Sequence, residues 1–472
     1  VVSIAMASRE TTGVVDLPRA GVPADHGLAS LGLVMQLAGR TSAALAALVA
    51  SLVVLDAQPI RHASWFFFAV GLSISRSEVH RIAGRDLLYS RRTLDGVADP
   101  FDATRTYIAF GLLHAVAIGL IATRALGATP TTAAGITAAL ALWPIVLAVV
   151  VRLPRFRALR AGIPLGEDRG LEGASILMTI LGACGVLSTG AIVALLGGLS
   201  SRHLEHGWGT MLVVVFALLL VRSCLHLRVG VIGLRDTSFD RPGELASRYV
   251  SFGVISAFCV GAVLALFALS ARLPPIAIAS VTITCWLLAV WPVTLKRYVS
   301  HRQFAELLAG DRVLHRRSPD AGLTGLGWLL AGHATAVASA LILELTVEPH
   351  GIGRLLDGAL QLTGATGRSP ADLAVAAIVV GLEALAAIAL IRMTDHRRAI
   401  ATIYALIAGA VALAAVWPAA RTLGQHSLDL RVILRWLPAA IQIVIPAATL
   451  VLVRRTVVPT ARASYRVAPP SS

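Results

Sequence analysis

The chain has 472 residues, of which 56% are hydrophobic and 14% are Asp, Glu, Lys or Arg, and its formal net charge is +15. Ordinary soluble domains carry about 25% charged residues, so this composition excludes both a soluble globular enzyme and a disordered chain. Together with a mean hydropathy of +0.77, it predicts an all-α protein, a polytopic transmembrane helix bundle.

Apolar stretches long enough to cross a bilayer give the expected number of spans. A hydrocarbon core about 30 Å thick requires about 20 helical residues. The second stretch is the weakest, because it soon reaches Arg76. The sequence predicts about twelve spans, at residues 31–55, 64–80, 106–124, 132–151, 172–197, 208–228, 249–270, 275–295, 322–345, 373–391, 399–417 and 436–453.

The basic residues of the connecting segments predict the orientation. With the N-terminus inside, 31 of the 41 Lys and Arg residues lie on the cytoplasmic side, as the positive-inside rule requires. These residues are spread over many short loops, so orientation explains the net charge better than a nucleic-acid partner does. Anionic lipid headgroups of the bilayer remain candidate partners.

The kind of basic residue indicates a source. Lys296 is the single lysine and the other basic residues are arginine, which we interpret as codon bias in a GC-rich bacterium. We therefore predict a bacterial cytoplasmic (inner) membrane protein with both termini in the cytoplasm.

Several motifs recur in the same order 142–148 residues apart, which predicts a duplicated four-helix unit in parallel orientation. A third Trp-Pro pair, at residues 417–418, is left open as a further repeat. The recurring pairs of motifs are Arg76-Ser77-x-x-His80 with Arg222-Ser223-x-x-His226, Tyr107-x-x-Phe110-Gly111 with Tyr249-x-x-Phe252-Gly253, and Trp143-Pro144 with Trp291-Pro292.

The predicted organisation follows from these spans and repeats. In chain order it comprises a cytoplasmic segment (1–30), a first transmembrane helix (31–55), two four-helix repeats (64–197 and 208–345), an extracytoplasmic loop (346–372), a three-helix segment (373–453) and a basic cytoplasmic tail (454–472).

Glu383 is the leading candidate for a functional residue, because it lies in the middle of an apolar run. An ionisable group at this depth costs a few kcal/mol or more, and is expected to face the bundle interior or a wet cavity. The residue could carry protons, or it could be a protonated carboxyl bonded to a neighbouring helix.

Three further polar residues lie within predicted spans. His114 and His333 are candidate proton-relay partners of Glu383, although a single histidine in a membrane span more often bonds two helices together. Arg40 could bind an anion or pair with Glu383; alternatively, its side chain extends to the inner interface.

The recurring motifs suggest two other roles. Arg and His four residues apart share one helix face, so Arg76 with His80 and Arg222 with His226 could bind anions in a cytoplasmic vestibule, or could be ordinary positive charges at helix ends. Pro144 and Pro292, each preceded by Trp (Trp143 and Trp291), are expected to kink their helices. Such kinks serve either as gates or as packing features.

Motifs of soluble enzymes, phosphate loops and metal centres are missing from the sequence. His203 and His206 lack a carboxylate cluster, and the four cysteines form no CxxC pair, so we expect neither a metal nor a cofactor. The acidic residues Asp95, Asp99 and Asp102 are the best cluster for a membrane-embedded enzyme.

Taken together, the sequence favours a secondary transporter for a small solute or a lipid-linked molecule, proton-coupled through Glu383. The alternatives are a membrane scaffold or assembly subunit that does not transport, and an enzyme acting on lipid-linked substrates.

Overall fold

The computed structural model describes residues 28–55, 63–89, 101–125, 127–153, 171–200, 208–235, 240–270, 288–296, 322–346, 370–392, 394–423 and 430–454. In these ranges the chain forms twelve helices and no strand. The helices are α1 (Leu28–Leu55), α2 (Ala63–Tyr89), α3 (Asp102–Ala125), α4 (Pro130–Val151), α6 (Leu171–Ser200), α7 (Trp208–Arg235), α8 (Asp240–Ser270), residues 288–296, α11 (Leu323–Thr346), α13 (Pro370–Arg392), α14 (Arg397–Leu423) and α15 (Leu430–Arg454).

The predicted fold class is confirmed at the level of a helical membrane protein. Within the described residues, eight helices are long and apolar enough to cross a membrane, namely α3, α4, α6, α7, α8, α11, α13 and α14. The count of twelve spans stays a prediction. The N-terminal segment, the C-terminal tail beyond residue 454, and His203 with His206 lie outside the described residues.

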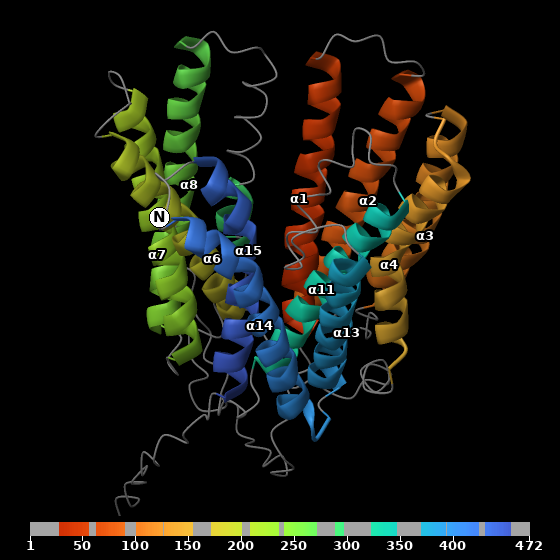
Figure 1. Cartoon of the computed structure of the whole chain (residues 1–472). Helices are drawn as coiled ribbons and strands as arrows, with labels where there is room; N and C mark the ends of the chain where they lie inside the picture. The colour runs from red at the N-terminus through yellow and green to blue at the C-terminus, as the bar shows by residue number, and fades with distance from the viewer. Residues whose placement is uncertain are drawn as a thin grey trace, which may run out of the picture.

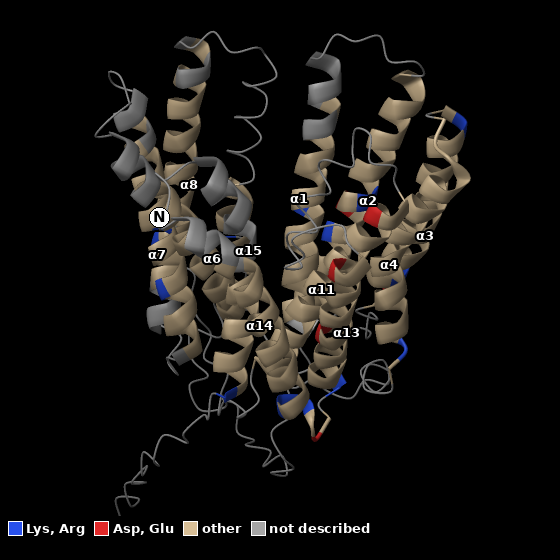
Figure 2. Ribbon diagram, viewed as in Figure 1, with Lys and Arg blue, Asp and Glu red and all other residues tan. Residues whose placement is uncertain are grey.

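The surface supports a membrane environment. Large apolar side chains point outward along several helices; Phe258 on α8 is 75% exposed and Leu113 on α3 is 68% exposed. Such exposure costs little where lipid, rather than water, surrounds the helix. Figure 2 shows charged residues at helix ends and few along the lengths of the helices.

In the described residues the core forms four clusters; one lies between α11 and α13 alone, and each of the three larger ones is built mainly by consecutive helices. Figure 1 shows α1–α4 on the right, α6–α8 on the left and α11–α15 between them. One cluster joins α1–α4 to Trp328 of α11, another joins α6–α8 and residues 288–296 to Leu33 of α1, and the last joins α11–α15 to Ile176 of α6. Each set of helices thus packs against a helix that opens another set.

Contacts between the sets follow the same order. Helix α4 packs on α11, and α15 packs on α6. Arg40 of α1 donates a hydrogen bond to the Thr294 hydroxyl of residues 288–296. The helix that ends each set therefore contacts the helix that begins another, and the three contacts form a closed ring.

Small residues bring α1, α6 and α11 together near their N-termini. A Cβ added to Gly325 of α11 would lie 3.3 Å from the Gly173 Cα of α6 and 2.9 Å from the Ser30 hydroxyl of α1. Ser30 is 2% exposed. Glycine and serine permit such close backbone approach between membrane helices, so three helices meet at one point.

Glycines also set the spacing of the helix pair α1–α2. A Cβ added to Gly84 would lie 2.7 Å from the Gln36 backbone nitrogen, whereas one added to Gly71 on the same helix has nothing within 4 Å.

We expect Gly84→Ala to lower the free energy of unfolding by about 1–3 kcal/mol, because the backbones must separate. Gly71→Ala is the matched control, and thermal unfolding of both purified variants is the measurement. Equal unfolding midpoints would contradict the expectation.

Candidate functional site

The predicted Arg-His motif and the predicted Trp-Pro motif meet in one cluster among α2, α3 and α4. Arg76 donates to the Leu140 carbonyl oxygen at 2.8 Å. This carbonyl lies one turn before Pro144, which has no N–H to donate to it. The Arg76 guanidinium therefore replaces the helix hydrogen bond that proline removes.

His80 completes this first cluster. The Trp143 indole N–H donates to His80 Nε2 at 3.0 Å, and the His80 ring stacks on Tyr107 with centroids 4.3 Å apart. His80 is 6% exposed and Tyr107 is 2% exposed. Aromatic stacking and a buried hydrogen bond thus fix the three helices together.

The second pair of motifs forms a matching cluster in α7, α8 and residues 288–296. Arg222 donates to the Leu288 carbonyl, one turn before Pro292. The hydroxyl of Tyr249 lies 3.2 Å from His226 Nδ1, and the His226 ring is tilted against Tyr249 at 4.6 Å. The Arg–carbonyl bond and the His–Tyr ring contact therefore recur in both clusters, whereas the Trp–His hydrogen bond of the first has no counterpart at Trp291, whose indole N–H is buried without a partner among the described residues.

These contacts bear on the proposed vestibule. A cytoplasmic vestibule requires Arg76 and Arg222 at the ends of their helices, but both lie near the middle of α2 and α7. Arg222 is 7% exposed and His226 is 8% exposed. Bonds to neighbouring helices anchor both Arg-His pairs, while Arg222 Nη1 and His226 Nε2 are buried without a hydrogen-bond partner among the described residues. An anion-binding role stays a prediction.

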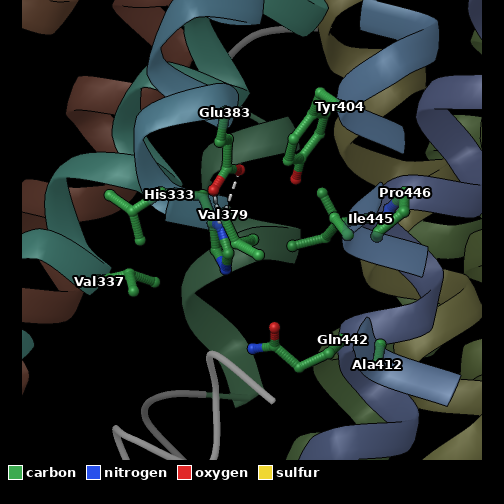
Figure 3. A pocket seen from close by; sticks show the side chains of 11 residues that line it. His333, Val337, Val379, Glu383, Tyr404, Ala412, Gln442, Ile445 and Pro446 are labelled. Atoms are coloured by element: carbon green, nitrogen blue, oxygen red, sulfur yellow. Dashed lines mark hydrogen bonds and ion pairs between the residues drawn. The ribbon is translucent and has the colours of Figure 1, made fainter. Parts of the chain in front are cut away.

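Glu383 lies in a second kind of polar site, where α13 faces α11 and α14. Its carboxylate oxygens are 2.8 and 3.0 Å from the Nδ1 atom of His333 on α11. Glu383 is 2% exposed, whereas the His333 side chain is 28% exposed. Figure 3 shows the Tyr404 hydroxyl of α14 directed toward the carboxylate.

The exposed part of His333 borders a cavity between α11, α13, α14 and α15. The cavity measures about 20 Å³, which is room for about one water molecule. Figure 3 shows Glu383, His333, Tyr404 and Gln442 grouped around it. The remaining lining residues are Val337, Val379, Val380, Ala408, Ala412, Ile445 and Pro446.

The other predicted residues lie elsewhere. His114 accepts a hydrogen bond from Arg76 at Nδ1 (3.2 Å) and lies 3.1 Å from the Ser73 hydroxyl through Nε2. Arg40 lies at the contact between α1 and residues 288–296. Of the four residues predicted for a substrate or proton pathway, the structure therefore brings Glu383 and His333 together.

The alternative enzymatic cluster has little described structure. Asp102 is exposed and forms an ion pair with Arg105 at 3.2 Å, while Asp95 and Asp99 lie outside the described residues. Among the residues that the structure describes, no three His, Cys, Asp or Glu side chains are grouped as metal ligands.

Sequence reasoning missed Tyr404, Gln442 and Pro446. They lie in Ala- and Ile-rich stretches without a recurring Trp-Pro motif. One signal was present: a small residue follows the tyrosine by one helical turn in all three cases, as Gly111, Gly253 and Ala408. The third Trp-Pro pair of the sequence, at residues 417–418, lies instead near the end of α14.

No protein-family model, curated protein or solved structure matches this chain.

Proposed function

We propose that the chain is a secondary transporter whose coupling site is the Glu383–His333 pair, and that this site carries a proton. The observation that carries the proposal is the position of the pair. A carboxyl group that is 2% exposed faces an imidazole and a small cavity inside a membrane bundle. Intramembrane ionisable residues in such positions commonly mark ion or proton pathways.

The arrangement of the pair suits proton exchange. His333 Nδ1 lies within hydrogen-bond distance of both carboxylate oxygens, so a proton can lie on either partner without leaving the site. The cavity beside the pair has room for a water molecule that links it to further groups. The substrate is a small solute or a lipid-linked molecule that moves with, or against, this proton.

We further propose that three four-helix units compose the bundle: α1–α4, α6–α8 with residues 288–296, and α11–α15. The two matching Arg–His–Pro clusters support the first two units. The three larger core clusters and the ring of contacts support the third. These units begin one helix earlier than the repeats predicted from sequence.

The third unit extends the predicted duplication. A Cβ added to Gly111 or to Gly253 would lie 2.7 Å from Pro144 or Pro292, and one added to Gly409, the residue after Ala408, would lie 3.8 Å from Pro446. This makes Pro446 of α15, rather than Pro418 of α14, the third member of the series. Parallel repeats of this kind occur in several transporter folds, which supports the proposal by analogy.

Access to the cavity from the two membrane faces tests transport without knowledge of the substrate. In a background with the four cysteines replaced by serine, Val379→Cys places a thiol on the cavity. A membrane-impermeant thiosulfonate reagent is expected to label it both in right-side-out and in inside-out vesicles, because a transporter exposes its site alternately. Mass spectrometry of the labelled protein is the measurement.

A matched control and the opposite outcome define this test. Leu385 lies on the same helix and is 58% exposed on the outer surface, so Leu385→Cys should face lipid and stay unlabelled from either side. Labelling of Val379→Cys from one face alone, or from neither, would contradict transport and favour the scaffold. The second candidate function is a membrane scaffold that does not transport. It is favoured by the small size of the cavity, which has room for about one water molecule.

A further inference from the structure

Three places in the bundle share one arrangement of side chains, which we call a frame, and differ in the charged residues beside it. Each frame consists of a buried tyrosine, a small residue one turn later and a proline that packs near it: Tyr107 with Pro144, Tyr249 with Pro292, and Tyr404 with Pro446. Tyr107, Tyr249 and Tyr404 are 2%, 1% and 2% exposed. The frames therefore offer three versions of one local environment.

In the first two frames a guanidinium group occupies the space beside the proline. Arg76 bonds to the Leu140 carbonyl, and Arg222 bonds to the Leu288 carbonyl. Each of these carbonyls lacks the proline N–H that would otherwise bond to it. The protein's own cation thus satisfies a carbonyl oxygen inside the bundle at both places.

The third frame has no arginine at the corresponding position. Arg76 and Arg222 precede His80 and His226 by four residues, and the residue four before Glu383 is Val379. Val379 and Pro446 both line the cavity. Pro446 cannot donate to the carbonyl of Gln442. The cavity therefore borders the two positions, Val379 and Pro446, that we align with the arginine and the proline of the other two frames.

The groups around this cavity are suited to a cation. Glu383 supplies a carboxylate, Tyr404 a hydroxyl and Gln442 a side-chain amide. The backbone carbonyl of Gln442, one turn before Pro446, also lacks a proline N–H to bond to it. Hard cations prefer oxygen ligands of this kind. Carbonyls released from helix hydrogen bonding coordinate Na⁺ in transporter folds of other kinds. The titratable groups that face Glu383 are His333 of α11 and Tyr404 of α14.

We propose that this cavity binds a monovalent cation of the size of Na⁺, held by oxygen atoms of Glu383, Tyr404 and Gln442. The cation takes the place of the arginine that the other two units supply from within the chain. The site deepens the proposed function by naming Na⁺ as an ion that exchanges with the proton at Glu383. Its argument rests on the correspondence of the three units.

Sodium-dependent stability tests the site on the purified full-length protein in detergent. The unfolding midpoint, followed by tryptophan fluorescence, is compared in NaCl and in choline chloride at equal ionic strength. A cation that binds the folded state alone raises the midpoint as its concentration rises. We expect a saturable increase with Na⁺, and a loss of this increase in Glu383→Gln.

Val379→Arg is the sharper variant, because it supplies the guanidinium of the other two units. Its midpoint in choline is expected to equal or exceed that of the native protein in choline, and Na⁺ should no longer change it. Val375→Leu, on the outward face of the same helix, is the matched control and should keep the full Na⁺ effect. If Val379→Arg does not fold, Gln442→Leu provides the same loss of Na⁺ response.

Two results would overturn the proposal: native protein with the same midpoint in Na⁺ and in choline, or the same Na⁺ effect in native protein and in Glu383→Gln. Neither result bears on alternating access, which the labelling of Val379→Cys decides separately. Labelling from both faces without a Na⁺ effect would leave a proton-coupled transporter and remove the sodium site.

Discussion

Replacing His333 with alanine is expected to lower the free energy of unfolding by about 3 kcal/mol, because it leaves the Glu383 carboxylate in the bundle interior without its partner. Glu383 is 2% exposed, and both of its oxygens lie near His333 Nδ1. Unfolding of the purified protein in mixed micelles of increasing SDS content measures the change. Removing one partner of a buried ion pair lowers the free energy of unfolding even where the intact pair contributes little net stability.

Two further variants separate the pair from the surrounding packing. In His333→Ala/Glu383→Gln the remaining amide carries no charge, so the double variant should be more stable than His333→Ala alone. Thr335 on the same helix bonds only to the Ala331 carbonyl of its own helix in the described contacts, and Thr335→Ala should cost about 1 kcal/mol or less. A similar cost for His333→Ala and Thr335→Ala would show that the pair does not hold α11 to α13.

Pro144→Ala is expected to destabilise the native protein but to stabilise Arg76→Met. In the native protein the new backbone N–H competes with Arg76 for the Leu140 carbonyl, whereas in Arg76→Met it supplies the missing donor. A buried carbonyl without a donor costs about 1–3 kcal/mol. The coupling energy of the double-mutant cycle should be of this order, and thermal or SDS unfolding of the four proteins gives it.

Pro130 provides the control for this cycle. It occupies the first turn of α4, where the Thr129 side chain caps the helix and proline removes no helix hydrogen bond. Pro130→Ala should therefore have the same effect with Arg76 and with Met at position 76. Additive effects of Arg76→Met and Pro144→Ala would show that the guanidinium does not replace the proline hydrogen bond.

The fold class could be predicted from the sequence because a membrane-spanning helix needs a long apolar stretch, and such stretches can be recognised without any tertiary structure. Helix ends were harder to predict. Helix α2 continues to Tyr89, well beyond the predicted span at 64–80, since ion pairs such as Glu78–Arg81 allow a helix to extend past its apolar part. Such extensions follow from local pairing that hydropathy does not record.

The candidate site was predicted in part. Glu383 and His333 stand out in sequence because charge is scarce inside apolar runs. The Arg-His and Trp-Pro motifs also stand out, but their interpretation as anion sites and gates treated them separately. Their contact depends on α2 and α4 both packing on α3, which brings Arg76 and His80 within reach of α4 and which only the tertiary structure provides. Tyr404 carries one weak signal, the small residue Ala408 one turn later, and Gln442 carries none. The relevance of both comes from facing Glu383 across the cavity.

The ring of contacts has a consequence for how such a bundle is assembled. The helix that ends one set packs on the helix that begins another, through α4 with α11, α15 with α6, and residues 288–296 with α1. Head-to-tail contacts that close after three steps are those of a cyclic trimer of separate chains. Within a single chain, the three proposed units are free to differ. In the proposed units, two can therefore keep the arginine that bonds to a carbonyl before proline, while the third has Val379 in its place and a cavity beside Glu383.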